Sequence, residues 1–330
     1  MPRPSEDELI AAYFAPLAGP AGLGLSDDAA LLYPPSGHEL VISTDMLAAG
    51  VDFFADDPPD AIAKKALRVN LSDLAGKAAQ PLGFLLSLAL PADWTEAWLS
   101  RFASGLGEDG RAYSCPLIGG DTMKSPDGLI LSITAIGTVA QGQMVPRGGV
   151  AEGDLLYVSG TIGDAALGLR LRRADVHDAG WVAGLEPKAR EYLSDRYLLP
   201  QPRLDLARAL KNHAHAAMDI SDGLAGDLAK MLRLTGLTAE IAVEGLPLSD
   251  AARQALARDP ALIATILSGG DDYEILCAIA PAEAAAFEQE ARTAGVAVTR
   301  IAQARGGSES PVFRTAQGPV VLPTLAYQHF

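Results

Sequence analysis

Short apolar runs that stop at an aspartate recur along this chain of 330 residues. The first begins at Val41 and ends on Ser43, Thr44 and Asp45. Apolar β-branched residues favour a half-buried strand, so the run predicts a strand with Asp45 at its C-terminal end. One aspartate in that place is usually only a turn former. The recurrence favours a ligand role instead: Asp stands with Gly, Ser or Thr beside an apolar segment again at residues 25–28, 70–73, 118–122, 218–223 and 268–272.

The hydrophobic periodicity predicts a chain of mixed helices and strands. A capping box from Ser5 to Glu8 predicts a short first helix, and Asp60 is expected to be the N-cap of another. Period-2 or continuous apolar runs predict further strands at residues 29–33, 82–90, 129–139, 154–158, 216–220, 276–280 and 297–301. Helical spacing predicts further helices at residues 94–106, 165–172, 204–211, 224–233 and 282–294.

Polar residues inside apolar segments mark candidate sites. Asn70 and Asp73 are three apart on the helix expected after Asp60, so they share one face. That face points inward at something polar, or else the two are a solvated surface pair. Gly119 and Gly120, before Asp121, allow the backbone to approach a phosphate closely.

A Gly- and Pro-rich stretch at residues 141–152 predicts a domain junction, with domains at residues 1–145 and 146–330. It contains Arg147, which is either solvated or able to bind a nucleotide phosphate. The second half begins with a strand and the sequence SGTIGD before a helix, a geometry that suits phosphate. This stretch lacks the Lys of a Walker loop and the spacing of a dinucleotide fingerprint.

Composition narrows the chemistry. The net charge of −15, from 26 basic and 41 acidic side chains, argues against nucleic-acid or anionic-membrane partners. Many carboxylates and hydroxyls with few cations suggest oxygen-only sites for Mg²⁺. Cys115 and Cys277 are far apart, without a CxxC, and a reducing cytoplasm is expected. The start has no signal-peptide pattern, and the apolar runs are too short to cross a bilayer.

The ordered motifs give a more specific indication. In sequence order they are SDDAALL, ISTDML, KALRVNLSDLA, LIGGDT, VPRGG, VSGTIGDAALGL, LPQPR, DISDGL, SGGDDYE and YQHF. As a set over nearly the whole chain, they resemble the thiamine-monophosphate kinase family, within the aminoimidazole ribonucleotide synthetase superfamily. The resemblance implies an α+β, two-domain architecture. An N-terminal ATP/Mg-binding and dimerisation domain with a mixed sheet and helices is followed by a C-terminal α+β domain that completes the nucleotide and substrate site.

The resemblance also implies the activity and its residues. The reaction would move the γ-phosphoryl of ATP onto thiamine monophosphate in a cytoplasmic homodimer. The implied Mg²⁺ ligands are Asp28, Ser43, Thr44, Asp45, Asp73, Asp121 and Asp219, with Asp222 near a further cation. ATP would meet Gly120, Asp121, Arg147 and Ser221; the substrate would meet Asp52, Asp271 and Tyr327; Asp45, Asp121 and Arg147 would be the catalytic group.

This sequence departs from the family pattern at a few of these places. The family usually has Gly at Ser26, His at Asp52 and often Glu at Asp271, so substrate contacts are the part that could differ. Two alternatives stay open from the sequence: an ATP-dependent ligase or cyclo-ligase of the same superfamily, and a non-catalytic Mg-nucleotide binding protein.

Overall fold

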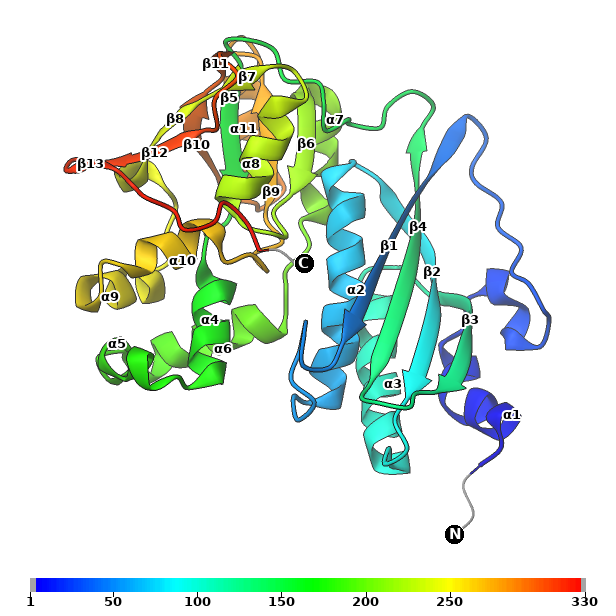
Figure 1. Ribbon diagram of the computed structural model, residues 1–330. Coiled ribbons are helices and arrows are strands. Elements are labelled where there is room, and N and C mark those ends of the chain that lie inside the picture. Colours follow the sequence, from blue (N-terminus) through cyan, green and yellow to red (C-terminus); the bar gives the residue numbers. More distant parts are fainter. Residues whose placement is uncertain (1–3, 328–330) are drawn as a thin grey trace. The chain divides into compact units, whose positions relative to one another are not determined.

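The computed structural model describes residues 4–327, which form two compact units. The first unit contains the chain up to Leu74 and Ala79–Gln143; the second contains Ala75–Ala78 and the chain from Met144. Each has its own sheet and helices (Figure 1). The expected α+β architecture with an N-terminal mixed sheet is confirmed. No helix among the described residues is long and apolar enough to cross a bilayer.

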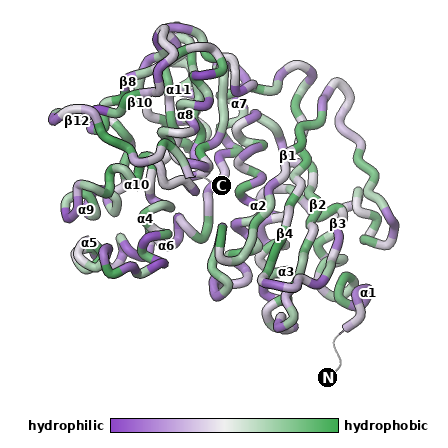
Figure 2. The backbone as a smooth tube through the Cα atoms, viewed as in Figure 1, coloured by the Kyte–Doolittle hydropathy of each residue, from purple (hydrophilic) through white to green (hydrophobic). Residues whose placement is uncertain are grey.

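The sheet of the first unit has the strand order β1-β4-β2-β3. Its strands are β1 (His38–Ala48), β2 (Gln80–Leu90), β3 (Leu117–Lys124) and β4 (Ile130–Ala140). β2 and β3 are parallel and the other pairs antiparallel. Strands β1 and β3 are therefore the two edges of the sheet. In Figure 2, β2 and β4 carry green, hydrophobic stretches.

Two long helices, α2 (Pro59–Gly76) and α3 (Glu96–Ala112), lie on one face of this sheet (Figure 1). Phe84, Leu86 and Leu88 of β2 are buried, whereas Ser87 between them is exposed, as a half-covered sheet requires. Before β1 come α1 (Glu6–Leu9), the short helical segments η1 (Ile10–Phe14), η2 (Ala15–Leu17) and η3 (Pro20–Leu25), and then an irregular stretch.

The sequence predicted some of these boundaries and missed others. The capping box of Ser5 and Glu8 is confirmed. The helix expected after Asp60 begins at Pro59, because proline suits the first helical turn, so Asp60 lies in that turn and is not the N-cap. The strand expected at residues 29–33 is wrong. That segment belongs to no ladder among the described residues, and Ala29, Ala30 and Leu32 line a pocket.

The second unit is built on an antiparallel sheet with the order β10-β5-β9-β6. These strands are β5 (Leu155–Ser159), β6 (Ala214–Asp219), β9 (Ile275–Ile279) and β10 (Val298–Gln303). Successive residues of the strands face two different cores: Leu156, Val158 and Met218 belong to one, and Tyr157, Ala217 and Cys277 to the other. A sheet covered on both faces reads as continuous apolar runs, which is what its sequence contains.

Helices surround this sheet. Leu167 of α4, Leu228 of α8 and Ile266 of α10 pack into the first core, and Leu210 of α7 and Phe287 of α11 into the second. The helices of this unit are α4 (Asp164–Arg173), α5 (Ala179–Ala183), α6 (Pro187–Leu198), α7 (Ala207–His213), α8 (Leu224–Arg233), α9 (Asp250–Arg258), α10 (Leu262–Ser268) and α11 (Ala284–Thr293), with the short turns η4 (Val176–Asp178), η5 (Leu204–Leu206) and η6 (Val243–Gly245). The smaller strands are β7 (Leu237–Thr238), β8 (Glu240–Ala242), β11 (Arg305–Gly306), β12 (Val312–Thr315) and β13 (Gly318–Pro319).

Candidate active site

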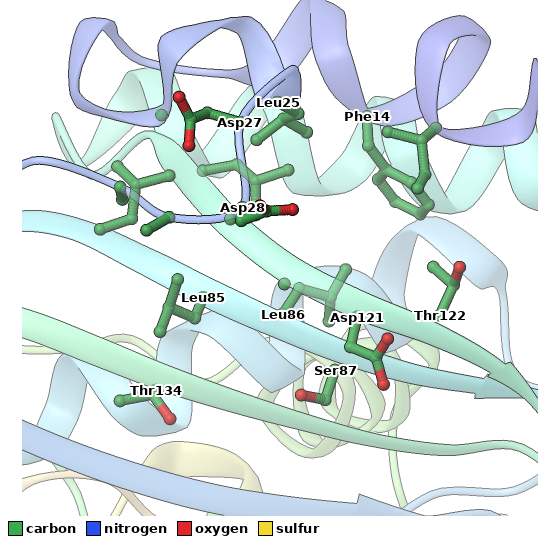
Figure 3. Close-up of a pocket in the computed structure, with 18 of the residues that line it drawn as sticks. Phe14, Leu25, Asp27, Asp28, Leu85, Leu86, Ser87, Asp121, Thr122 and Thr134 are labelled. Carbon is green, nitrogen blue, oxygen red and sulfur yellow. The ribbon is translucent and has the colours of Figure 1, made fainter. Parts of the chain in front are cut away.

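A pocket of about 770 Å³ lies in the first unit, over the sheet face opposite α2 and α3. Its floor contains residues of β2, β3 and β4, and its other wall comes from α1, η1 and the stretch after η3 (Figure 3). Three of the residues predicted from the sequence line it: Asp28, Gly120 and Asp121. In Figure 3, Asp121 and Ser87 lie side by side on neighbouring strands, and Asp27 and Asp28 come from the loop above them.

The backbone at Gly120 explains the glycine in the motif. Gly120 pairs with Leu86 across the parallel strands, and a Cβ atom built on it would lie 1.9 Å from the carbonyl oxygen of Leu86. Only glycine fits there without moving β2. Its neighbour Asp121 pairs with Ser87 and is exposed toward the pocket. On the next residue, the Thr122 hydroxyl donates to Oε1 of Glu6 at 2.9 Å and ties α1 to β3.

The charge of the pocket points to a cation. Its lining includes four carboxylates, from Glu6, Asp27, Asp28 and Asp121, and among the described residues that line it there is no Lys, Arg or His. Phosphate groups would be repelled by such a surface unless a cation lay between them. Carboxylate and hydroxyl oxygens are what Mg²⁺ prefers, so the donor set fits this ion.

A second polar group lies where β1 faces α2. The Ser43 hydroxyl donates to Oδ2 of Asp73, and the Asp45 amide donates to Oδ1 of Asn70 at 3.0 Å. Asn70 is fully buried, and its amide nitrogen donates to the Ala66 carbonyl. The expectation of an inward polar face on this helix is therefore confirmed for Asn70.

Thr44 lies on the other face of β1, because side chains alternate along a strand. The Thr134 hydroxyl of β4 donates to it at 3.1 Å, on the face that carries the pocket. Asp52 follows β1 in a turn, where its Oδ2 accepts from the Ala48 amide at 2.8 Å. The Asp52 side chain thus holds the turn together, whatever else it contacts.

In the second unit, the loop after β6 meets the loop before β9. Asp219 ends β6 and is 8% exposed. The Asp271 amide donates to the Ser221 carbonyl at 2.8 Å, and the Tyr327 amide donates to the Asp222 carbonyl at 3.0 Å. Residues predicted to face ATP, a cation and the substrate are therefore joined by main-chain hydrogen bonds. Gln328 to Phe330 of the terminal motif lie outside the described residues.

This second-unit group is backbone-strained. Gly270, Asp271 and Tyr273 have φ angles of 75°, 66° and 50°. Left-handed non-glycine residues cost about 1–3 kcal/mol each and persist only where the surroundings hold them, often at functional sites. Here the surroundings include the hydrogen bonds from Tyr273 N to Ile220 O and from Ile220 N to Glu274 O, both at 2.8 Å.

The glycine loop between β5 and α4 has a different use from the one its sequence suggested. The Gly163 amide, at the N-terminus of α4, lies 2.9 Å from both carboxylate oxygens of Asp272. Asp272 is 1% exposed, and burial raises its pKa well above the ordinary value. The donor that could have met a phosphate is thus occupied by a carboxylate of the same chain.

A buried ion pair network lies beside it. Glu274 is 0% exposed and accepts from Arg196 at 3.0 Å, from Ser159 at 2.6 Å and from two guanidinium nitrogens of Arg203. A Cβ on Gly160 would lie 2.2 Å from Oε1 of Glu274, which explains the first glycine of SGTIG. This network links the VSGTIGD, LPQPR and GGDDYE motifs.

Arg147 is exposed, in the segment that enters the second unit. The carbonyl of Pro146 accepts from the Ala217 amide at 2.9 Å, and a Cβ on Gly149 would lie 2.0 Å from the His215 carbonyl, so this segment runs against β6. Its proposed phosphate contact stays a prediction.

Within the first unit the predicted metal ligands fall into two groups, and others belong to the second unit. Asp28 and Asp121 share the pocket, Ser43, Asp45 and Asp73 lie at β1 and α2, and Asp219 and Asp222 lie in the second unit. Within residues 4–327 of one chain, no three His, Cys, Asp or Glu side chains are poised around one metal ion.

Sequence analysis missed several polar residues at these places. Glu6, Asp27 and Ser87 line the pocket, and Lys230 pairs with Asp222. Lys230 had one visible signal, since it follows Asp227 by three residues on a helix. Asp27 stands beside Asp28 in the SDDAALL motif, whereas Glu6 and Ser87 carry no motif that marks them.

Comparisons with known proteins agree with the motifs. The family models for AIR synthase related protein match residues 26–139 (N-terminal domain) and 151–313 (C-terminal domain). A thiamine-monophosphate kinase from Caulobacter vibrioides is 41% identical over 91% of this chain and 84% of its own length.

Solved structures are similar over most of the chain. A thiamine-monophosphate kinase from Stenotrophomonas maltophilia superposes with a TM-score of 0.79 at 36% identity, covering 90% of this chain and 91% of the other. AaThiL complexed with AMPPCP and TMP has a TM-score of 0.75 at 29% identity, covering 90% and 89%. The chain belongs to the thiamine-monophosphate kinase family, within the AIR synthase related proteins.

Proposed function

We propose that this protein is a thiamine-monophosphate kinase, which transfers the γ-phosphoryl group of ATP to thiamine monophosphate and forms thiamine diphosphate and ADP. The observation that carries the proposal is the carboxylate-lined pocket around Gly120 and Asp121, in a chain of this family. The Caulobacter vibrioides relative bears this activity in its name, and AaThiL forms a complex with AMPPCP and TMP.

The acceptor and donor are both phosphates, which decides what the residues must do. At 4 Å two unit charges repel by about 4 kcal/mol at an effective dielectric of 20. The acceptor phosphate is already an oxyanion, so neither a general base nor a covalent nucleophile is needed. In-line transfer then requires positioning of the two phosphates and neutralisation of their charge.

We assign the neutralisation to Mg²⁺, which fits the oxygen-only donor sets. The residues that would hold it are Asp28, Ser43, Thr44, Asp45, Asp73, Asp121 and Asp219. When bound, Mg²⁺ neutralises phosphate oxygens and orients them. Gly120 leaves space for the nucleotide to approach the backbone, Ser221 and Arg147 donate to its phosphates, and Asp271 and Tyr327 face the thiamine end. Asp52 would join them through its second carboxylate oxygen, because Oδ2 accepts from the Ala48 amide.

We also propose a homodimer in which the site is shared between chains. Asp45 and Asp121 lie on the two edge strands, separated by β4 and β2. Three inter-strand spacings amount to about 14 Å, too far for one ion that binds oxygens at about 2.1 Å. The edge strand β1 also exposes Leu40, Ile42 and Met46, which are 43%, 62% and 70% exposed on one face. A second copy of the chain that covers this face would bury these three side chains; Asp45 itself lies on the opposite face of β1, against α2.

The test of function is an assay with ATP, Mg²⁺ and thiamine monophosphate, scored for thiamine diphosphate. Turnover that is lost in Asp121→Asn, with an unchanged melting curve, supports the proposal. A thermal shift in Mg²⁺ plus AMPPCP, relative to chelator, provides a readout that is independent of activity. A chain that forms no thiamine diphosphate in this assay would refute the function.

The shared site has its own test. Asp45→Asn and Asp121→Asn are each expected to be inactive. When the two variants are co-expressed, about half of the dimers carry one of each chain, and each such dimer has one intact site if Asp45 and Asp121 act from different chains. Activity should return to roughly a quarter of the wild-type value per chain. No recovery, with mixed dimers demonstrated by mass spectrometry, would place both residues in sites formed within one chain.

The expected compartment is the cytoplasm, where ATP is available. Cys115 and Cys277 are both free and buried, which suits a reducing environment. Cell fractionation would test this placement.

A further inference from the structure

Lys230 of α8 lies between two carboxylates of its own chain. Its Nζ donates to Oδ1 of Asp227 at 2.9 Å and to Oδ2 of Asp222. The lysine side chain is 35% exposed and Asp227 is fully buried. A lysine that donates to two carboxylates is an ammonium at neutral pH.

Asp227 depends on this ammonium. Its other oxygen, Oδ2, accepts from the main-chain amides of Ser221 at 3.1 Å and Asp222 at 2.9 Å. Burial raises the Asp227 pKa, and Lys230 acts in the opposite direction. A buried carboxylate that loses its ionic partner is strongly destabilised. Lys230 thus neutralises the side chain that holds the backbone of the loop.

The loop fixed in this way carries the second-unit site. The carbonyl of Ser221 accepts from Asp271 N, and the carbonyl of Asp222 accepts from Tyr327 N. Ser221 is the residue proposed to face ATP, and Asp271 and Tyr327 those proposed to face the substrate. The Lys230 ammonium therefore lies beside the Ser221–Asp222 loop, to which Asp271 and Tyr327 are hydrogen-bonded.

Family resemblance implies a cation near Asp222, and Mg²⁺ is the ion that such proteins would use. The residues at Asp222 do not fit a divalent ion. A metal on Oδ2 of Asp222 would take the position of the ammonium and leave Asp227 buried without its partner, and a metal on Oδ1 of the same carboxylate would still lie close to the ammonium and repel it. An ammonium and Mg²⁺ compete here for the same carboxylate.

We propose that the cation beside Asp222 is the ammonium of Lys230, which takes the place of a divalent metal and positions the Ser221–Asp222 loop. Lys230 is a positioning residue, since no contact with a reacting group is assigned to it. The inference rests on the proposed Mg²⁺- and ATP-dependent function.

The test counts metal ions, so it does not depend on turnover. Mn²⁺ bound per chain is measured by electron paramagnetic resonance in the presence of AMPPCP. Wild type and Asp222→Asn should bind the same number of ions. Lys230→Met should bind one more, and Lys230→Met/Asp222→Asn should return to the wild-type number.

Controls keep the count interpretable. Lys230→Met leaves Asp227 buried and charged, so Asp227→Asn/Lys230→Met provides a neutral pair that should fold and also gain one ion. Lys64→Met removes a lysine that pairs with Glu108 at 2.7 Å in the first unit, and it should leave the count unchanged.

Two results would overturn the inference: an ion lost in Asp222→Asn, or no ion gained when Lys230 is replaced in a folded protein. Failure of the proposed function is a separate result, because wild type would then form no thiamine diphosphate whatever the ion count of its variants.

Discussion

Glu274→Gln tests whether the buried network supports the second unit. The Glu274 carboxylate accepts four hydrogen bonds, two from Arg203, one from Arg196 and one from Ser159. Glutamine has the same size, but its NH₂ end would face donors, so about two of these bonds are lost. Bonds to charged groups contribute about 1.5–3 kcal/mol each, which predicts a loss of about 3–6 kcal/mol in unfolding free energy. Breaking a buried ion pair independently suggests about 3–5 kcal/mol.

The assay is differential scanning calorimetry, which can separate the transitions of two units. For a domain of this size, about 2–4 °C is lost per kcal/mol, so the second-unit transition should fall by about 10 °C. Glu290→Gln is the matched control. Its carboxylate is 30% exposed, accepts from the neutral Asn212 amide at 3.1 Å, and lies 3.7 Å from His213 and 4.0 Å from Arg208, itself 82% exposed, so a loss of about 1 kcal/mol or less is expected. Equal losses in the two variants, or a Glu274→Gln protein as stable as wild type, would refute the reasoning.

Other predictions concern chemistry and access. Asp45→Asn should lower kcat by about 100-fold or more through lost transition-state stabilisation, with an unchanged melting curve. Asp93→Asn, which changes an exposed aspartate elsewhere, should change neither kcat nor the melting curve. Near-normal kcat in folded Asp45→Asn would remove Asp45 from the metal site. Tyr327→Ala removes an aromatic face for the thiazolium cation, an interaction that contributes about 0.5–2 kcal/mol. The KM for thiamine monophosphate should therefore rise about 2- to 30-fold, while the KM for ATP and kcat change little. Equal increases in the KM values of both substrates would place the thiamine pocket elsewhere. Burial raises the pKa of Cys115 to about 12, so at pH 8 only about one Cys115 thiol in 10⁴ is ionised. A thiol reagent should therefore react with Cys115 only when the protein unfolds. Rapid labelling of Cys115 in the native protein would contradict this prediction.

Interactions between residues close in the chain allowed several features of this protein to be predicted from its sequence. Ser5 and Glu8 cap a helix because their spacing alone brings the two groups together. The fully buried strands of the second unit were visible as continuous apolar runs, and the ordered motifs were enough to identify the family. These features depend on neighbours within a few residues or on the identity of the residues themselves.

Tertiary structure decided how those residues are used, because distant segments compete for the same atoms. Gly163 offers its amide as a phosphate site would, yet Asp272, more than a hundred residues later, accepts that hydrogen bond. Asp45 and Asp121 end similar motifs, and strand order alone puts them on opposite edges of one sheet. Residues 29–33 have the composition of a strand but find no ladder partner among the described residues, and Ala29, Ala30 and Leu32 line the pocket. Asp222 was predicted to meet a cation; which cation it meets was decided by the helix that brings Lys230 to it.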